Sequence, residues 1–189
     1  ALLSRGLGDV YKRQSYNYIG LNMKPDGIKH KPFFVDQKVR RAMAYLTPVD
    51  EIIEVMVHGK ASRQASQISP LKYTYNDTLA LIPLDIGKAK KLLSEAGWVD
   101  TDGDNIRDKI INGVRTPFKF KLSYMSSPIS KEIVLMIKES MYKAGIFAEP
   151  TPMDFTLFYK NAMDHNFEAM LGGWGGSASY SNPQQLWHT

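Results

Sequence analysis

The chain of 189 residues contains no cysteine. This absence excludes disulfide bonds, thiolate catalysis and cysteine metal sites, and it leaves the redox compartment open. The chain also lacks an uninterrupted apolar run of about 18 residues or more, so the sequence predicts no membrane-spanning helix. Lysine and arginine are spread along the chain instead of forming the cluster that a phosphate backbone requires, and we expect no nucleic-acid partner.

Motifs for catalysis are missing as well. The sequence has no G-x-S-x-G, no H-E-x-x-H and no glycine motif that would cradle a phosphate. Its histidines follow no metal-ligand spacing; they are His30, His58, His165 and His188. We therefore expect neither an enzyme nor a cofactor. A hydrolase with two close carboxylates is a rival hypothesis, but no acidic pair stands at motif spacing.

The first 14 residues look foreign to the protein. The run SRGLGDVYKRQ at Ser4–Gln14 ends in residues whose back-translation fits GAT GTG TAT AAG AGA CAG, the end of a transposon-based sequencing adapter. We interpret residues 1–14 as translated adapter and residues 15–189 as the protein, with a natural basic tail as the alternative. Without residues 1–14 the formal net charge falls from +5 to +3, which is only mildly basic.

The stretch from Asp85 to Asp104 (DIGKAKKLLSEAGWVDTDGD) carries the strongest local signals. Asp85 is a typical N-cap, since its carboxylate accepts the free N–H groups of a first helical turn. A helical apolar stripe follows, made by Ala89, Leu92, Leu93 and Ala96. Gly97 predicts a left-handed residue that ends the helix, and Trp98 is expected to pack back over the helix end.

Beyond this helix, strand-like and helix-like segments alternate. Alternating or β-rich patterns predict strands at residues 15–22, 116–124, 146–152 and 167–171. Apolar spacing predicts helices that start near Asp36, near Thr47 as an N-cap, near Ser130 and near Asp154. This alternation is typical of an α/β layered domain.

Six segments resemble segments of one family, in the same order. They are YNYIGLN, KPFFVDQKVRRAMAYL, EIIEVMVHG, the Asp85 helix (D-x-x-K-A-K-K-L-L-x-E-A-G-W), IKESMYKAGI and FEAMLGGWG. The family is family 5 of the extracytoplasmic solute-binding proteins, which serve peptide-type ABC importers and include dipeptide, oligopeptide and nickel binders. The resemblance extends from Tyr16 to the end of the chain.

This resemblance implies a fold and a function. The fold is α/β, a mixed sheet flanked by helices, forming one lobe of a two-lobed periplasmic-binding-protein-like (type II) fold that closes on a solute by a hinge. Residues 15–189 would be the second, ligand-binding lobe, truncated at both ends. The implied function is that of an ABC importer's substrate-binding subunit, a monomer that captures a peptide or peptide-like solute and delivers it to a membrane permease. It would be periplasmic or lipid-anchored on the outer face of the cytoplasmic membrane.

The best candidates for ligand binding form one run near the end of the chain. They are Gly172, Gly173, Trp174, Gly175, Gly176 and Ser177. Glycines allow a ligand backbone to approach closely, and Trp174 offers a flat apolar face with one N–H donor. We expect a glycine-rich turn at an open edge; a turn with Trp174 in the core is the alternative. Peptide binders of the family often carry an acid just after this turn to hold the ligand's α-amine, but here Ser177 stands nearest that place.

The acidic loop after Trp98 raises an alternative function. Asp100, Asp102 and Asp104 place carboxylates at alternate positions, as in half of a calcium loop. The register departs from a calcium loop, because Asn105 replaces the expected glycine and Ile111 the expected glutamate. A turn held by aspartate side chains explains the pattern as well. We expect no metal, and the alternative is a calcium-stabilised extracellular interaction domain.

Overall fold

The computed structural model describes residues 14–24, 30–66, 68 and 75–176. The chain divides into two compact units, one of residues 1–18, 64–80 and 173–189 and one of residues 19–63 and 81–172. All described helices belong to the second unit. Two strands, β1 (Gln14–Leu21) and β6 (Ala169–Gly176), each run from one unit into the other.

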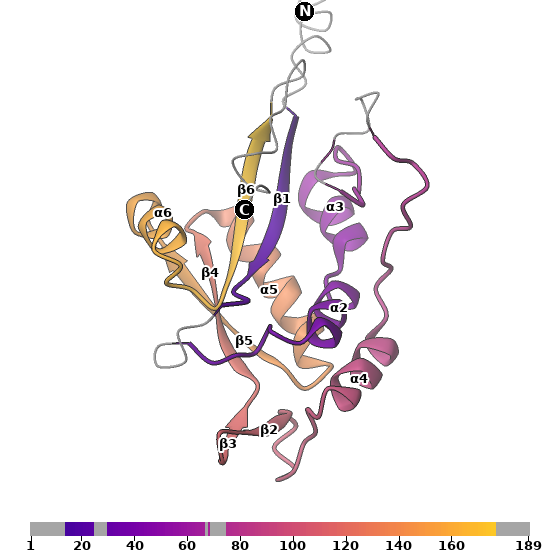
Figure 1. The fold of residues 1–189 in the computed structure, drawn as a ribbon. Coiled ribbons are helices and arrows are strands. Elements are labelled where there is room, and N and C mark those ends of the chain that lie inside the picture. Colours follow the sequence, from indigo (N-terminus) through magenta and orange to yellow (C-terminus); the bar gives the residue numbers. More distant parts are fainter. Residues whose placement is uncertain (1–13, 25–29, 67, 69–74, 177–189) are drawn as a thin grey trace, which may run out of the picture. The chain divides into compact units, whose positions relative to one another are not determined.

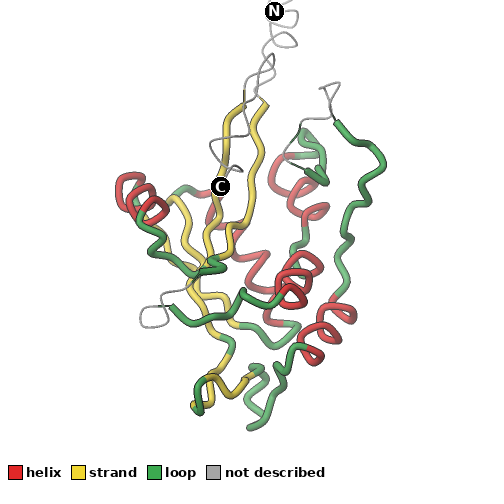
Figure 2. Tube along the Cα trace, in the orientation of Figure 1, coloured by secondary structure: helices red, strands yellow, loops and turns green. Residues whose placement is uncertain are grey.

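A four-stranded sheet has the order β1-β6-β4-β5 (Figure 1). Strand β4 (Lys119–Met125) runs parallel to both β5 (Phe147–Met153) and β6, whereas β1 runs opposite to β6, so the sheet is mixed. Helix α5 (Pro128–Tyr142) connects β4 to β5, and α6 (Phe155–Met163) connects β5 to β6 past β4. These right-handed connections move in opposite directions and therefore place the two helices on opposite faces of the sheet (Figure 2).

Capping side chains begin most of the described helices. The N-caps whose side chains accept a backbone N–H are Asp36 for α2 (Gln37–Tyr45), Asp85 for α4 (Ile86–Glu95), Ser127 for α5 and Asp154 for α6. The predicted cap of α3 (Val49–Val57) is wrong. Pro48 is its N-cap, without a side-chain bond, because the Thr47 hydroxyl instead donates to the Met43 carbonyl at the end of α2 at 2.9 Å.

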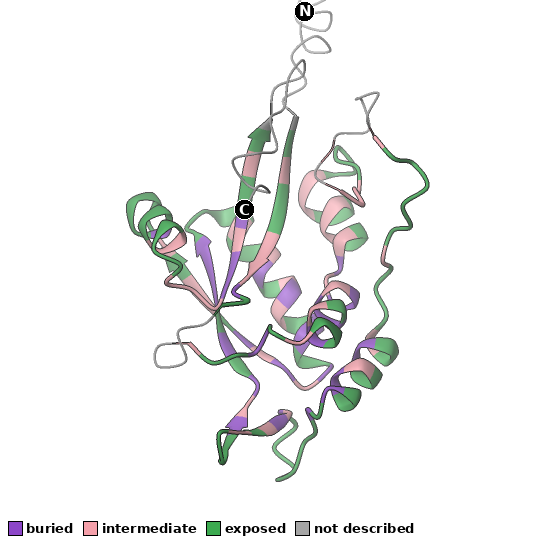
Figure 3. Cartoon of the chain, viewed as in Figure 1, coloured by how far each residue is buried: buried purple, intermediate pink, exposed green. Residues whose placement is uncertain are grey.

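The predicted end of α4 is confirmed. Gly97 has φ 82°, and the Trp98 N–H donates to the Leu93 carbonyl at 2.9 Å, which is a Schellman-type ending. Trp98 is only 2% exposed, and its ring centroid lies 4.3 Å from that of Phe118. Buried positions gather where α2, α4 and α5 face the core (Figure 3).

A two-stranded hairpin precedes β4. Strands β2 (Asp108–Ile111) and β3 (Val114–Pro117) pair antiparallel around Asn112 and Gly113, whose φ angles are 51° and 79°. The strand predicted at residues 116–124 is wrong in its extent, because these residues comprise the end of β3 and most of β4. Two successive positive φ angles are what a type I′ Asn-Gly turn requires, so this dipeptide was a signal for the hairpin. Among the described residues no helix has the length and apolar character to cross a bilayer.

Candidate functional site

The glycine-rich run lies at the carboxyl end of β6. Residues Gly172–Gly176 continue this strand, so the predicted turn is wrong. The reason is pairing: β1 lies along the same strand and gives its backbone groups hydrogen-bonding partners, which a glycine-rich sequence alone does not reveal. Ser177 lies outside the described residues.

The other edge of β6 is only partly paired. Its register with β4 covers Ala169 to Leu171, where Leu171 lies opposite Tyr124. From Gly172 onward, no described strand pairs with this edge of β6. Gly172 is buried, Gly173 and Gly175 are exposed, and Trp174 is half-buried, so its indole is neither free in solvent nor enclosed in the core.

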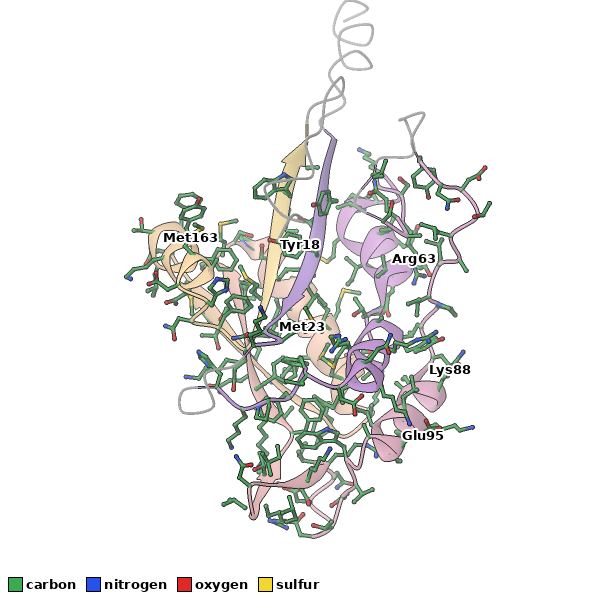
Figure 4. The ribbon with its side chains drawn as sticks, in the orientation of Figure 1. Tyr18, Met23, Arg63, Lys88, Glu95 and Met163 are labelled. Atoms are coloured by element: carbon green, nitrogen blue, oxygen red, sulfur yellow. The ribbon has the colours of Figure 1, made fainter. Side chains whose placement is uncertain are left out.

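Tyrosines of β1 share a face with Trp174. A Cβ at Gly173 would lie 2.9 Å from the Asn17 side chain, so Gly173 and Asn17 occupy the same face of the paired strands. Because side chains alternate along a strand, Tyr16, Tyr18 and Trp174 occupy the opposite face. In the antiparallel pair, Tyr16 then stands across from Trp174. The rings of Tyr16 and Tyr18 are 6.1 Å apart (Tyr18 is labelled in Figure 4).

Electrostatics agree with a partly dry aromatic face. Burial, and secondarily the neighbouring Tyr18, raise the pKa of the Tyr16 phenol. Sequence reasoning missed both tyrosines as site residues and assigned them only to a strand. Their two-residue spacing was the available signal, but the strand that lies beside them is distant in the sequence and could not be identified from it.

The sheet's topology also favours this region as a binding site. The connections after β4 and β5 lead in opposite directions, so the strand order reverses between β4 and β6. In open α/β sheets, ligands bind outside the carboxyl ends of the strands at such a reversal. Here the reversal lies where β4 ends at Met125 and β6 continues at Gly172.

The acidic loop is held by its own hydrogen bonds. The Asp100 carboxylate accepts the N–H groups of Gly103 and Asn105 at 2.8 and 3.0 Å, and Asp104 accepts that of Ile106 at 2.7 Å. These bonds are the aspartate-held turn that was one of the two interpretations of the loop.

One set of three carboxylates nevertheless converges. Oxygens of Asp100, Asp102 and Asp108 lie within 4.8 Å of one another, so Asp108 replaces the predicted Asp104 in this group. Thr101 donates to the buried Asp108 through both its N–H and its hydroxyl. A hydrogen bond from Arg115, at 2.5 Å, lowers the pKa of Asp102 and compensates its charge. Each carboxylate of the group therefore already has a partner within the protein.

Solved structures share this fold. The structure of the oligopeptide-binding protein AppA from Bacillus subtilis, in complex with a nonapeptide, superposes with a TM-score of 0.81 at 25% identity, covering 98% of this chain and 37% of that one. The oligopeptide-binding protein from Thermus thermophilus superposes with a TM-score of 0.77 at 18% identity, covering 85% of this chain and 28% of that one. The fold is that of a lobe of a two-lobed solute-binding protein, as the resemblance implied.

Sequence comparison identifies the family. The profile of the bacterial extracellular solute-binding proteins, family 5 Middle, matches residues 4–189, and the chain belongs to this family. AppA of B. subtilis is 28% identical over 179 residues, 93% of this chain and 31% of AppA. The dipeptide-binding protein of Escherichia coli is 29% identical over 141 residues, 75% of this chain and 24% of that protein. The chain thus spans less than a third of the length of these relatives.

Proposed function

We propose that this chain is part of the substrate-binding subunit of an ABC importer, which captures a peptide or similar extended solute outside the cytoplasmic membrane and delivers it to a membrane permease. The observation that carries the proposal is the one-sided pairing of β6 over Gly172–Gly176. Backbone N–H and C=O groups on the edge without a described partner strand can pair with the main chain of an extended ligand, whatever its side chains.

Aromatic contacts add affinity on one face of the same strands. Trp174 and Tyr16 are half-buried and Tyr18 is exposed. Their flat rings offer surfaces against which apolar ligand groups lose contact with water. No aspartate or glutamate lies between Trp174 and Thr189, so an ion pair to the ligand's α-amine is not part of the proposed recognition.

The relatives support a peptide as the ligand class. AppA and the E. coli relative are named as oligopeptide-binding and dipeptide-binding proteins. Heme-binding protein A of Haemophilus influenzae is also 28% identical, over 144 residues, so membership alone does not fix the ligand. An unpaired strand edge suits a peptide better than a flat macrocycle. We further propose a monomer without catalytic activity or nucleic-acid partner, located in a periplasm or lipid-anchored outside the membrane.

Main-chain recognition can be tested directly with modified peptides. The protein encoded by the gene's full reading frame is titrated with a mixture of synthetic pentapeptides and nonapeptides, and binding is followed by native mass spectrometry. Successive main-chain N–H groups of an extended peptide point to opposite edges, so each of the two alternate sets of nitrogens is methylated in a separate peptide. The set that faces β6 should lose about tenfold or more in affinity when methylated, because each lost N–H removes a strand-type bond. Acetylating the peptide amine should change little. Equal binding of methylated and unmodified peptides would refute main-chain pairing.

The role of Trp174 is tested by mutation in the same protein. Trp174→Ala should weaken peptide binding about tenfold, as truncation of an aromatic anchor usually does. Tyr159→Ala is the matched control, because Tyr159 is a 57% exposed aromatic residue on α6. Both variants are first checked by thermal unfolding. Equal affinity for wild type and Trp174→Ala would show that Trp174 does not contribute to peptide binding.

A further inference from the structure

One asparagine stands in the connection between α3 and α4, whose described part is loop (Figure 2). Asn76, Asp77 and Thr78 form the sequence N-x-T with no proline in the middle, which is the acceptor pattern for asparagine-linked sugars. The chain has eight asparagines, and only Asn76 has a serine or threonine two residues further on. Asn76, Asp77 and Thr78 are all exposed, so a bulky group would fit there.

The side chains of Asn76 and Thr78 are joined by a hydrogen bond. The Thr78 hydroxyl donates to the Asn76 Oδ1 at 2.7 Å, and the Thr78 N–H donates to the same oxygen at 3.0 Å. Two donors on the oxygen polarise the amide and make its N–H groups more acidic. Among the described residues, none is bonded to the Asn76 Nδ2, so this nitrogen is the free end of the side chain.

The hydroxyl bond goes beyond what the loop needs for its shape. An asparagine turn is closed by the backbone N–H two residues further on, and most residue types can supply that donor. The bond from the Thr78 N–H therefore accounts for the turn without the hydroxyl. The second bond, from the Thr78 hydroxyl, requires serine or threonine at this position, which is also what the acceptor pattern requires.

We propose that Asn76 is an acceptor for asparagine-linked glycosylation, with an oligosaccharide on a lipid diphosphate as the donor. The Asn76 Nδ2 forms a bond to the anomeric carbon of the first sugar, and the bond from that carbon to the diphosphate oxygen breaks. The lipid diphosphate leaves with the electron pair, and the amide loses one proton to a base of the transferase. Modification in the cell rests on the proposed location outside the membrane. Asn76 belongs to neither β1 nor β6, so the site is independent of peptide binding.

Transfer to the purified chain tests the site apart from its location in the cell. The folded chain is incubated with a single-subunit oligosaccharyltransferase and a polyprenyl-diphosphate-linked oligosaccharide, and its peptides are mapped by mass spectrometry. An unrelated N-x-T peptide in the same mixture confirms that the transferase is active. The peptide that contains Asn76 should gain one oligosaccharide. Asn112 is the internal control, because it is also exposed but has Val114 where the threonine would stand. No sugar on Asn76, or equal transfer to Asn112, would overturn the proposal.

Variants of the same loop separate the hydroxyl from the turn. Thr78→Val keeps the shape and the backbone N–H and should lower the rate of transfer about tenfold, because the amide loses one hydrogen bond. Thr78→Ser keeps the hydroxyl and should be modified faster than Thr78→Val. Asp77→Pro should abolish transfer, since proline is not accepted in the middle position. Wild-type transfer to Thr78→Val would contradict the proposal. Thermal unfolding confirms that each variant is folded.

Discussion

At the start of α4, the Asp85 carboxylate accepts the Lys88 N–H at 2.8 Å, and the Asp85 N–H donates to the Tyr45 carbonyl at 2.9 Å. The side-chain bond is local and was predictable, because an N-cap side chain accepts from a backbone N–H only two or three residues further along the chain. The backbone bond to Tyr45 was not predictable, since it depends on how α2 and α4 pack.

Removing this cap gives a first prediction at the residue scale. Asp85→Ala should lower the free energy of unfolding by about 1 kcal/mol, because a helix N–H loses its acceptor. Chemical denaturation of the chain measures the change. Asp77→Ala is the control, because Asp77 is an exposed loop carboxylate outside any helix, and it should unfold like wild type. Equal losses in the two variants would contradict the capping role.

Arg107 shows what residue-level reading of the sequence missed. Its side chain donates to the carbonyls of Ala144 and Trp98 at 2.8 and 2.6 Å and to the Ser94 hydroxyl at 2.9 Å. It thus joins the ends of α4 and α5, where carbonyls lack helical partners. Burial lowers the pKa of Arg107. No local pattern marks this role, because Ala144 lies far away in the sequence.

At the element scale, the backbone requires glycine at one of two glycine positions and not at the other. Gly113 has φ 79° in the β2–β3 turn, and an added Cβ would meet nothing within 4 Å. Gly175 lies in β6, also with open space around a Cβ, but without a positive φ. The first is required by backbone conformation, and the second is not required by the fold.

This contrast gives a second prediction. Gly113→Ala should destabilise the chain by about 1 kcal/mol, because alanine is strained in the left-handed region. Gly175→Ala should leave stability within about 0.5 kcal/mol, since a strand accepts alanine more readily than glycine. Paired denaturation curves measure both values. A loss for Gly175→Ala as large as that for Gly113→Ala would contradict this distinction between the two glycines.

The elements themselves were mostly predictable, but their limits were not. The periods of α2, α4, α5 and α6 and their caps mark these helices because the signals are local. The sequence did not predict that β6 extends through Gly176, because glycines favour turns. These glycines form a strand because they pair with the neighbouring β1. The same long-range pairing sets Tyr16 across from Trp174, so the aromatic face could not be derived from spacing.

At the scale of the whole molecule, the fold class followed from alternating elements and from six ordered segments, and the family match confirms it. The division into two units could not be predicted from the sequence, because it runs through β1 and β6 rather than through a linker. The origin of residues 1–14 stays a prediction.

Binding by the chain alone is a third prediction. It should bind the pentapeptide and nonapeptide probes more weakly than micromolar, because solute sites of this size normally bury most of the ligand and the chain spans less than a third of its relatives. Isothermal titration calorimetry measures this. Micromolar binding would show that the described strands suffice as a site.

Calcium provides a fourth prediction. Millimolar calcium should shift the melting temperature of the chain by less than about 1 °C, since carboxylates that already have partners gain little from a cation. Asp100, Asp102 and Asp108 all have such partners. Differential scanning calorimetry with calcium, magnesium and chelator measures the shift. A rise of about 5 °C or more with calcium alone would favour the calcium-stabilised domain instead.

The open side of β6 has a consequence for handling the protein. A strand edge that offers backbone donors and acceptors does not distinguish a guest peptide from a second copy of itself. Over Gly172–Gly176 the strand carries no charged residue that would repel such a copy and no proline that would interrupt the pairing. Concentrated samples of the isolated chain should therefore self-associate edge to edge and precipitate. A short soluble peptide added during purification should reduce this precipitation.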